Sequence, residues 1–350
     1  MRFCIVLLTG IGDVVHALPI ANALKRSGMA THITWVTEPA PSFVLRPHPA
    51  IDDVIVYNKK LGARGVRELH RALRDQQFDV TLNLHIYFKG IWGTLFSRSP
   101  RRIGFDRGRS RDGVWLAANE LIPARPRAHT QDQFLEFLDY LKVPRDPIEW
   151  NITFTPEERA AQTIFFEQLD ARRKVTIVPA SSSEVKDWIP ARYARVIDAL
   201  QTDFGARVVL AGGPSAREWR IVSEIVDATA SAPAVALCRP VRRLMWIVAG
   251  SDLVIAPDTG PLHIARALEV PVIGLYGHTN PWRMGPYRKY EDLWVDRYTE
   301  PGTPPDPSNR EPKSGRMELI TVEDVLERVD RAFRSYVGNR DASASEPRGL

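Results

Sequence analysis

The sequence contains few cysteines, no long apolar run and little excess charge. Cysteine occurs only twice in 350 residues, at Cys4 and Cys238, which is too few for a disulfide framework and favours a reducing compartment. No apolar run reaches the roughly 20 residues that a membrane-spanning helix needs. Lys and Arg total 47 against 42 Asp and Glu, a net charge of +5, which permits an anionic ligand without demanding nucleic acid.

The amino terminus permits two interpretations. Arg2 precedes an apolar run over residues 3–8, and the later tripeptide Ala21-Asn22-Ala23 is similar to a signal-peptidase site. Two glycines and the charge of Asp13 interrupt the stretch between them. These interruptions favour the second interpretation, a buried strand that runs into a glycine turn.

Unbroken apolar runs alternate with helical patterns along most of the chain. Hydrophobic residues make up 44% and charged residues 25%, which is typical of a globular protein. Unbroken runs predict strands buried on both faces of a parallel sheet, so the alternation predicts an α/β fold. The expected strands are 3–8, 33–36, 54–56, 80–84, 175–178, 208–211, 253–256 and 272–275. The expected helices are 14–27, 66–76, 190–202, 242–250 and 261–268.

The alternation forms two blocks, separated by a stretch that contains prolines at 144, 147 and 156. We therefore expect a first doubly wound domain over 1–150 and a second over 151–320. A helix over 321–336 is expected to pack back on the first domain, and 337–350 to form a frayed tail. Doubly wound domains bind ligands outside the carboxyl ends of their strands.

The first motif, Gly10-Ile11-Gly12-Asp13, directly follows the first expected strand. Glycines there allow a tight turn and close approach of a ligand to the next helix. Gly10 and Gly12 fit the first two positions of the dinucleotide fingerprint G-x-G-x-x-G, but Val15 occupies the third. Asp13 either stabilises the helix start or serves as a general base.

The second motif is Asp258-Thr259-Gly260, followed by Pro261 and, in the same helical turn, His263. A strand, a tight turn and a helix that starts with proline leave free amides aligned with the helix dipole. Such a site suits a pyrophosphate. The alternative is that these are turn and cap residues beside a packed histidine.

A third loop, residues 180–188, follows another expected strand. It contains Ser181, Ser182 and Lys186 shortly before a helix. Hydroxyl groups and an ammonium beside a helix start suit phosphate oxygens.

Together these segments resemble the heptosyltransferase family, glycosyltransferases that build the inner core of lipopolysaccharide. The matching segments are 10–16, 33–36 with Glu38, Lys186 with Trp188, 258–265, 276–277 and 285–287. The resemblance implies a GT-B fold, in which two Rossmann-like domains face a cleft, with the acceptor in the first domain and the nucleotide sugar in the second. It also implies inverting transfer from ADP-heptose without a metal or other cofactor. The sequence agrees with the absence of a metal, because it contains no Asp-x-Asp pair, which other glycosyltransferases use to hold a divalent ion.

The resemblance also assigns roles to individual residues. Asp13 would be the catalytic base. The donor-binding residues would be Ser181, Ser182, Lys186, Glu218, Asp258, Thr259, Gly260 and His263, with Glu218 on the ribose. The acceptor-binding residues would be Gly12, Lys59, Lys60, Arg64, Lys89, Arg101 and Arg102.

Basic residues are dense in two stretches, around Lys59 to Arg67 and around Arg98 to Arg111. Such stretches are either solvated surface or, for this family, contacts to a phosphorylated lipid acceptor and an anionic membrane. We therefore expect a cytoplasmic protein, peripheral at the inner membrane. Nucleic acid is not expected as a partner, because no aromatic residues are interleaved with these charges.

The sequence thus favours transfer of heptose from ADP-heptose to Kdo or heptose of lipid A-linked core. Three alternatives are a GT-B enzyme with another nucleotide sugar, an NAD-dependent oxidoreductase, and a non-catalytic protein that binds sugar nucleotides.

Overall fold

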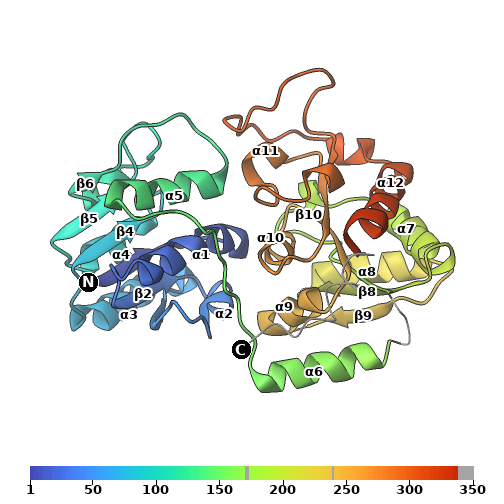
Figure 1. Ribbon diagram of the computed structural model, residues 1–350, viewed down its shortest axis with the longest axis horizontal. Coiled ribbons are helices and arrows are strands. Elements are labelled where there is room, and N and C mark those ends of the chain that lie inside the picture. Colours follow the sequence, from blue (N-terminus) through green and yellow to red (C-terminus); the bar gives the residue numbers. More distant parts are fainter. Residues whose placement is uncertain (170–172, 239, 338–350) are drawn as a thin grey trace. The chain divides into compact units, whose positions relative to one another are not determined.

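The structure is a computed structural model that describes residues 1–169, 173–238 and 240–337. The chain divides into two compact units, Met1–Thr153 and Phe154–Leu350, each built around its own parallel sheet (Figure 1). The expected frayed tail lies outside the described residues from position 338 onward.

The first unit has six parallel strands in the order β3-β2-β1-β4-β5-β6. The strands are β1 (Arg2–Val6), β2 (His32–Thr37), β3 (Asp53–Val56), β4 (Val80–Asn83), β5 (Arg101–Gly104) and β6 (Glu120–Leu121). The helices are α1 (Ile11–Arg26), α2 (Ser42–Leu45), α3 (Gly62–Arg74), α4 (Gly90–Phe96) and α5 (Thr130–Leu141), with short 3-10 helices η1 (Lys59–Leu61) and η2 (Val114–Ala117). Helix α1 packs against α5, whereas α3 packs against α4.

The second unit also has six parallel strands, in the order β12-β11-β10-β7-β8-β9. The strands are β7 (Arg173–Ile177), β8 (Ala206–Gly212), β9 (Ala234–Leu237), β10 (Leu253–Pro257), β11 (Val272–Tyr276) and β12 (Val295–Asp296). The longer helices are α6 (Pro156–Glu167), α7 (Pro190–Thr202), α8 (Ala216–Ala228), α9 (Val241–Ala249), α10 (Gly260–Ala267) and α12 (Val322–Ala332). The shorter elements are η3 (Glu184–Lys186), α11 (Pro281–Met284), η4 (Glu291–Leu293), η5 (Arg316–Leu319) and η6 (Phe333–Val337).

The two sheets have the same topology. If the six strands of each unit are numbered along the chain, both sheets have the order 3-2-1-4-5-6, which is the doubly wound order of nucleotide-binding folds. The prediction of an α/β fold with two doubly wound sheets is therefore confirmed. In each unit the strand order reverses between the first and fourth strands, which are β1 and β4 or β7 and β10.

Burial explains why the apolar runs became central strands. In β1, Phe3, Ile5 and Val6 are fully buried, and β10 is buried along its whole length. A strand covered by helices on both faces needs apolar side chains at successive positions rather than at alternate ones.

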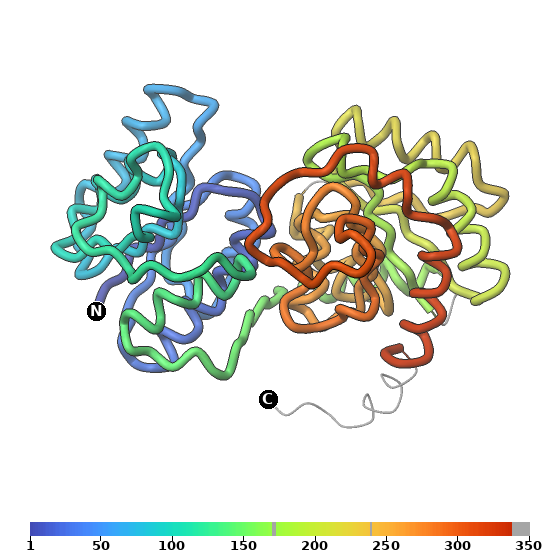
Figure 2. The backbone as a smooth tube through the Cα atoms, turned by 90° about the horizontal axis from the view of Figure 1, so that it is seen from above, coloured from blue at the N-terminus to red at the C-terminus, as the bar shows by residue number. Residues whose placement is uncertain are grey.

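The C-terminal helix corrects one expectation. Helix α12 was expected to pack on the first domain, but it packs on α7, β11 and β12 of the second unit. Figure 1 shows α12 beside α7, and Figure 2 shows the same helix in red. Its buried face consists of Val322, Val325, Val329 and Ala332. Its position is also fixed by Trp188, whose indole Nε1 donates to the Ile320 carbonyl at 3.1 Å just before the helix.

Candidate functional site

In the second unit, two adjacent strands end beside one another and bring distant residues together. Strands β7 and β10 are parallel neighbours, so the loops that follow them leave the same edge of the sheet. Lys186 lies in the loop after β7, and its Nζ is 2.8 Å from Oδ2 of Asp258, directly after β10. His263 Nε2 lies 3.4 Å from the other oxygen, Oδ1 of Asp258. The sequence predicted all three residues, and the structure brings them together.

Asp258 is ionised although it is buried. Only 7% of the residue is exposed, and burial alone would raise the pKa of its carboxyl group. The hydrogen bond with His263 and the charge of Lys186 outweigh burial and hold the pKa of Asp258 well below its ordinary value. The carboxylate therefore fixes the side chains of Lys186 and His263.

Helix α10 starts directly beside this cluster. Thr259 is its N-cap residue and forms no side-chain cap hydrogen bond, and Gly260 and Pro261 follow as the first helical residues. The first amides of a helix have no intrahelical partner and carry the positive end of the dipole. The predicted anion site thus lies next to an ammonium and an imidazole.

The loop after β7, which we call the lysine loop (residues 178–188), is shaped by residues that the sequence analysis missed. Asp187 accepts hydrogen bonds from the backbone N and the Oγ of Ser181, at 2.7 and 2.9 Å. Arg217 donates to Asp187 and to the Ser181 carbonyl. Ser181 was predicted to touch the donor. In this structure its hydroxyl is hydrogen-bonded within the loop, to the Ser183 carbonyl and to Asp187, whereas Ser182 is exposed. No local motif signals Arg217, because it lies 30 residues from its partner.

Glu218 has a structural role that differs from its predicted one. It was expected to bind the ribose, but it occupies the third position of α8 and forms a capping box with Ser215. Its Oε1 accepts from the Gly213 amide at 2.6 Å, and its Oε2 accepts from the Ser215 hydroxyl at 2.6 Å. A serine followed by a glutamate three residues later is the sequence signature of a capping box, so the sequence alone could have predicted this cap.

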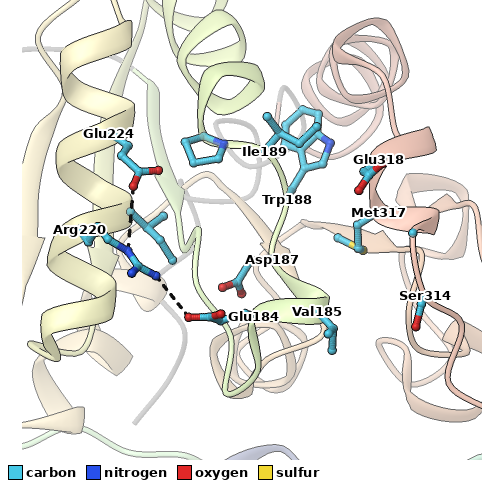
Figure 3. A pocket seen from close by; sticks show the side chains of 13 residues that line it. Glu184, Val185, Asp187, Trp188, Ile189, Arg220, Glu224, Ser314, Met317 and Glu318 are labelled. Carbon is cyan, nitrogen blue, oxygen red and sulfur yellow. Dashed lines mark hydrogen bonds and ion pairs between the residues drawn. The ribbon is translucent and has the colours of Figure 1, made fainter.

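A cavity of about 480 Å³ lies on the outer side of the lysine loop (Figure 3). Arg220 of α8 reaches between Glu184 and Glu224, at 3.2 and 4.0 Å, and Met317 and Glu318 stand on the opposite wall. Its lining residues include none of those predicted to bind the donor. The cavity therefore lies beside residues that hold the lysine loop in place, such as Asp187, and none of the residues of the anion site line it.

In the first unit, the predicted base lies at the equivalent strand end. Asp13 is the third residue of α1, after β1, and is half-buried. The Thr9 hydroxyl donates to Asp13 Oδ2 at 2.6 Å. The N-cap position is occupied by Gly10, so Asp13 is not the cap itself. As an acidic residue in the first turn it is still placed to stabilise the helix dipole, so both interpretations of Asp13 fit this geometry.

Glu38 connects the loops that surround this strand end. It follows β2, and its Oε1 lies 3.1 Å from Lys59 Nζ and 3.9 Å from Lys89 Nζ. His85, after β4, is bonded through Nε2 to the Leu8 carbonyl at 2.7 Å. Burial lowers the pKa of His85 more than this hydrogen bond raises it, so the imidazole is neutral at neutral pH. Glu38 belonged to the family pattern but was not predicted as a site residue.

The glycine turn does not require glycine for its conformation. Gly10 has φ −72° and ψ 172°, which any residue adopts, so the expected conformational reason is wrong at this position. A Cβ atom on Gly10 would meet nothing within 4 Å. The space beside Gly10 is therefore open.

The remaining predicted acceptor residues fall into two groups. Lys60 and Arg64 are exposed near the carboxyl end of β3, and Arg64 forms an ion pair with Glu68 at 2.8 Å. Arg101 and Arg102 open β5, in register with the start of β4, and so lie at the opposite edge of the sheet from Asp13.

The side chains of Arg101 and Arg102 also have structural partners. Arg101 forms two hydrogen bonds of 2.8 Å with Glu120, and Arg102 donates to the carbonyls of Ser99 and Ala117. The structure thus gives both arginines partners within the first unit, and their binding of the acceptor stays a prediction.

Within residues 1–169, 173–238 and 240–337, no three His, Cys, Asp or Glu side chains are grouped as a metal site. Over the same residues, no helix combines the length and apolarity needed to cross a bilayer.

Comparison with known proteins identifies relatives of this chain. The profile of glycosyltransferase family 9 (heptosyltransferase) matches residues 66–302. The lipopolysaccharide core heptosyltransferase OpsX of Haemophilus influenzae is 32% identical over 298 residues, which are 85% of this chain and 84% of OpsX. Lipopolysaccharide heptosyltransferase 3 of Escherichia coli is 23% identical over 95% of this chain and 98% of its own.

Solved structures share the fold. The glycosyl transferase family 9 protein of Veillonella parvula superposes with a TM-score of 0.81 at 21% identity, covering 95% of this chain and 97% of its own. The E. coli heptosyltransferase WaaC with ADP superposes with a TM-score of 0.73 at 20% identity, covering 95% and 100%. The GT-B architecture and the resemblance predicted from sequence are both confirmed, and the chain belongs to glycosyltransferase family 9, the heptosyltransferases.

Proposed function

We propose that this glycosyltransferase transfers heptose from ADP-heptose to Kdo or heptose in the inner core of lipopolysaccharide, with inversion. The membership of family 9 supports the reaction class, and OpsX is named a lipopolysaccharide core heptosyltransferase. A WaaC structure contains ADP-2-deoxy-2-fluoro heptose. The observation that carries the proposal is the cluster of Lys186, Asp258 and His263 beside the start of α10.

This cluster stabilises the leaving diphosphate. Negative charge develops on the bridging oxygen as the bond from the sugar to the phosphate breaks. The Lys186 ammonium, the His263 imidazole and the α10 amides neutralise that charge from fixed positions. Asp258 orients the first two groups before the donor arrives. Ser182, Thr259 and Gly260 complete the proposed donor contacts, and no step in this scheme routes through a metal.

Asp13 accepts the proton of the attacking acceptor hydroxyl. The hydroxyl oxygen forms the new bond to the anomeric carbon while the diphosphate leaves from the opposite face, which inverts the configuration. The proton passes to the Asp13 carboxylate, whose Oδ2 is held by Thr9. Proton transfer to a positioned base contributes typically 10²–10⁴-fold in rate.

We place the acceptor over the turn that contains Gly10 and Gly12, where the space beside Gly10 is open, and near Lys59, Lys60 and Lys89. Lys59 and Lys89 are oriented by Glu38 and offer positive charge to the anionic Kdo and phosphate groups of the acceptor. Because that acceptor is a lipid, we further propose that the protein works at the cytoplasmic face of the inner membrane.

A transfer assay tests this function. ADP-heptose with a Kdo-lipid A acceptor should release ADP, also in the presence of a chelator. UDP, GDP and dTDP sugars should give no turnover. Turnover with one of those donors, or a strict requirement for a divalent cation, would contradict the proposed donor site.

Asp13→Asn tests the base. The amide keeps the size of the side chain but cannot take the proton, so kcat should fall a hundredfold or more. The ADP affinity and the melting temperature should stay near the wild-type values. The matched control is Asp75→Asn, an exposed carboxylate at the end of α3. If Asp13→Asn keeps its rate and loses several degrees of melting temperature, Asp13 is structural.

A further inference from the structure

The first unit carries a surface on which positive charge and exposed apolar side chains lie side by side. We call it the α3–α4 surface and define it by the outward residues of α3 with Lys60, together with Phe88, Leu95 and Leu116. Helix α4 packs against α3 on one flank and against η2, which carries Leu116, on the other. The three segments therefore form one continuous surface.

The α3 part of this surface is strongly basic. The helix contains four arginines and one glutamate, and all four arginines are exposed, whereas Gly65, Leu69 and Leu73 face the core. Arg64 is paired with Glu68, and Arg74 with Asp75. Within the described part of the chain, Arg67 and Arg71 have no carboxylate within ion-pair distance. The charge of this helix is thus free to act on a partner.

The α4 part is apolar and exposed. Phe88 is 49% exposed, Leu95 42% and Leu116 77%, which is unusual for three large side chains in one neighbourhood. Phe88 packs edge-on against Trp92, with ring centroids 6.3 Å apart, so its ring is held in place at the surface. A basic helix beside anchored apolar side chains is the composition of an interfacial membrane surface.

The surface also adjoins the edge that holds the base. Helices α3 and α4 both start after the carboxyl ends of strands, as does Asp13, and Lys59 and Lys89 at those starts share Glu38. An acceptor sugar on a lipid anchored in a bilayer could therefore reach Asp13 from a bilayer that contacts α3 and α4.

We propose that the α3–α4 surface docks the protein on an anionic lipid bilayer. The inference rests on the proposed function only for the identity of the acceptor. The attraction between this surface and anionic lipids does not depend on that function. The arginines are attracted to anionic headgroups over about a Debye length, and Phe88, Leu95 and Leu116 enter the headgroup region. Arg101 and Arg102, which the sequence suggested for this role, are bound to Glu120 and backbone carbonyls.

Vesicle flotation tests the proposal with the full chain. The probes are vesicles of phosphatidylethanolamine with phosphatidylglycerol, and vesicles of phosphatidylcholine alone. The wild type should bind the first and not the second, and salt should weaken binding. Arg67→Ala with Arg71→Ala should weaken partitioning about fivefold for each charge, or roughly thirtyfold together. Leu95→Ser with Leu116→Ser should also weaken binding, without reducing its salt dependence.

The control removes the same charge elsewhere. Arg195→Ala with Arg334→Ala replaces two exposed arginines of the second unit and should leave partitioning unchanged. Melting curves establish that each variant is folded. Equal losses in the control and the α3 variant would show a general effect of net charge and overturn the proposal. A wild type that ignores anionic vesicles would overturn it as well.

A second acceptor separates this inference from the proposed function. With a deacylated, water-soluble Kdo acceptor, the α3 and α4 variants should turn over at the wild-type rate. With the acceptor embedded in vesicles, they should lose most of their rate. If neither acceptor is used by the wild type while vesicle binding follows the expected pattern, the docking surface stands and the proposed function fails.

Discussion

At the scale of single residues, Thr9 is the partner that positions Asp13, the proposed base. Its hydroxyl donates to Oδ2 of Asp13, so in the proposed mechanism Oδ1 is left for the acceptor hydroxyl. Thr9→Val keeps the shape but removes the hydrogen bond, whose worth to a charged group is about 1.5–3 kcal/mol. We expect kcat to fall about tenfold or more, with the KM for ADP-heptose unchanged.

Thr9→Ser provides the control, because it keeps the hydroxyl. This variant should regain most of the wild-type kcat. Equal losses for the valine and serine variants would mean that Thr9 acts through packing of its methyl group and not through Asp13.

The pKa of Asp258 predicts how the free energy of unfolding depends on pH. Its folded-state pKa lies below the ordinary value of 3.8, so its stabilising contribution is complete above that pH and disappears as the pH falls further. Asp258→Asn should lower the free energy of unfolding by roughly 2 kcal/mol at neutral pH, because Lys186 and His263 lose their charged partner. Urea unfolding should show this difference shrinking below about pH 4.

The comparison variant is Asp330→Asn, whose carboxylate is 45% exposed in an ion pair on α12. Its unfolding free energy should change little at any pH. A difference for Asp258→Asn that persists unchanged at acid pH would show that the ionised carboxylate is not the source of the stability.

Sequence analysis predicted the site residues that lie in a local motif, and it missed the residues whose partners are distant in the sequence. Asp258 lies just before α10 and His263 in its first turns, and Asp13 lies in the first turn of the helix after the first strand. Asp187 and Arg217 act together across 30 residues, which no local pattern reveals. Glu38 likewise depends on two lysines from other loops.

At the scale of elements, the start of α8 decides between two roles for Glu218. If Glu218 serves as a cap, Ser215→Ala and Glu218→Ala should each cost about 0.5–2 kcal/mol of unfolding free energy. Neither should change the ADP dissociation constant, which titration calorimetry measures. A rise in that constant for Glu218→Ala alone would establish the predicted ribose contact.

The elements missing from the sequence-based prediction include the helices α4, α5, α6 and α8 and four short or polar strands. The β5 strand begins with two arginines, β6 and β12 have two residues each, and β9 is only half-buried. Such segments lack the apolar run that marks a central strand. For β6, β9 and β12 the reason is their place at the edge of a sheet, whereas β5 lies inside its sheet and starts with two arginines that are only half-buried. The direction of β5, which the sequence did not predict, places Arg101 and Arg102 at the opposite edge of the sheet from Asp13.

At the scale of the whole molecule, the alternation of apolar runs and helical patterns was enough to predict the fold class. Every expected central strand is present, because burial on both faces dictates a continuous apolar sequence. The attachment of α12 was not predictable in the same way. Its apolar stripe shows that one face is buried, but not whether α7 or a helix of the first unit covers it.

The repeated strand order has a consequence for evolution. In both units the proposed site loops follow the first and fourth strands. Each sheet would therefore bind one ligand at the place where its strand order reverses. Since the chain divides between Thr153 and Phe154, acceptor and donor recognition would be encoded in consecutive, non-overlapping stretches of the gene. Recombination near that junction would exchange the acceptor preference of one family member for that of another and keep the ADP-heptose site intact.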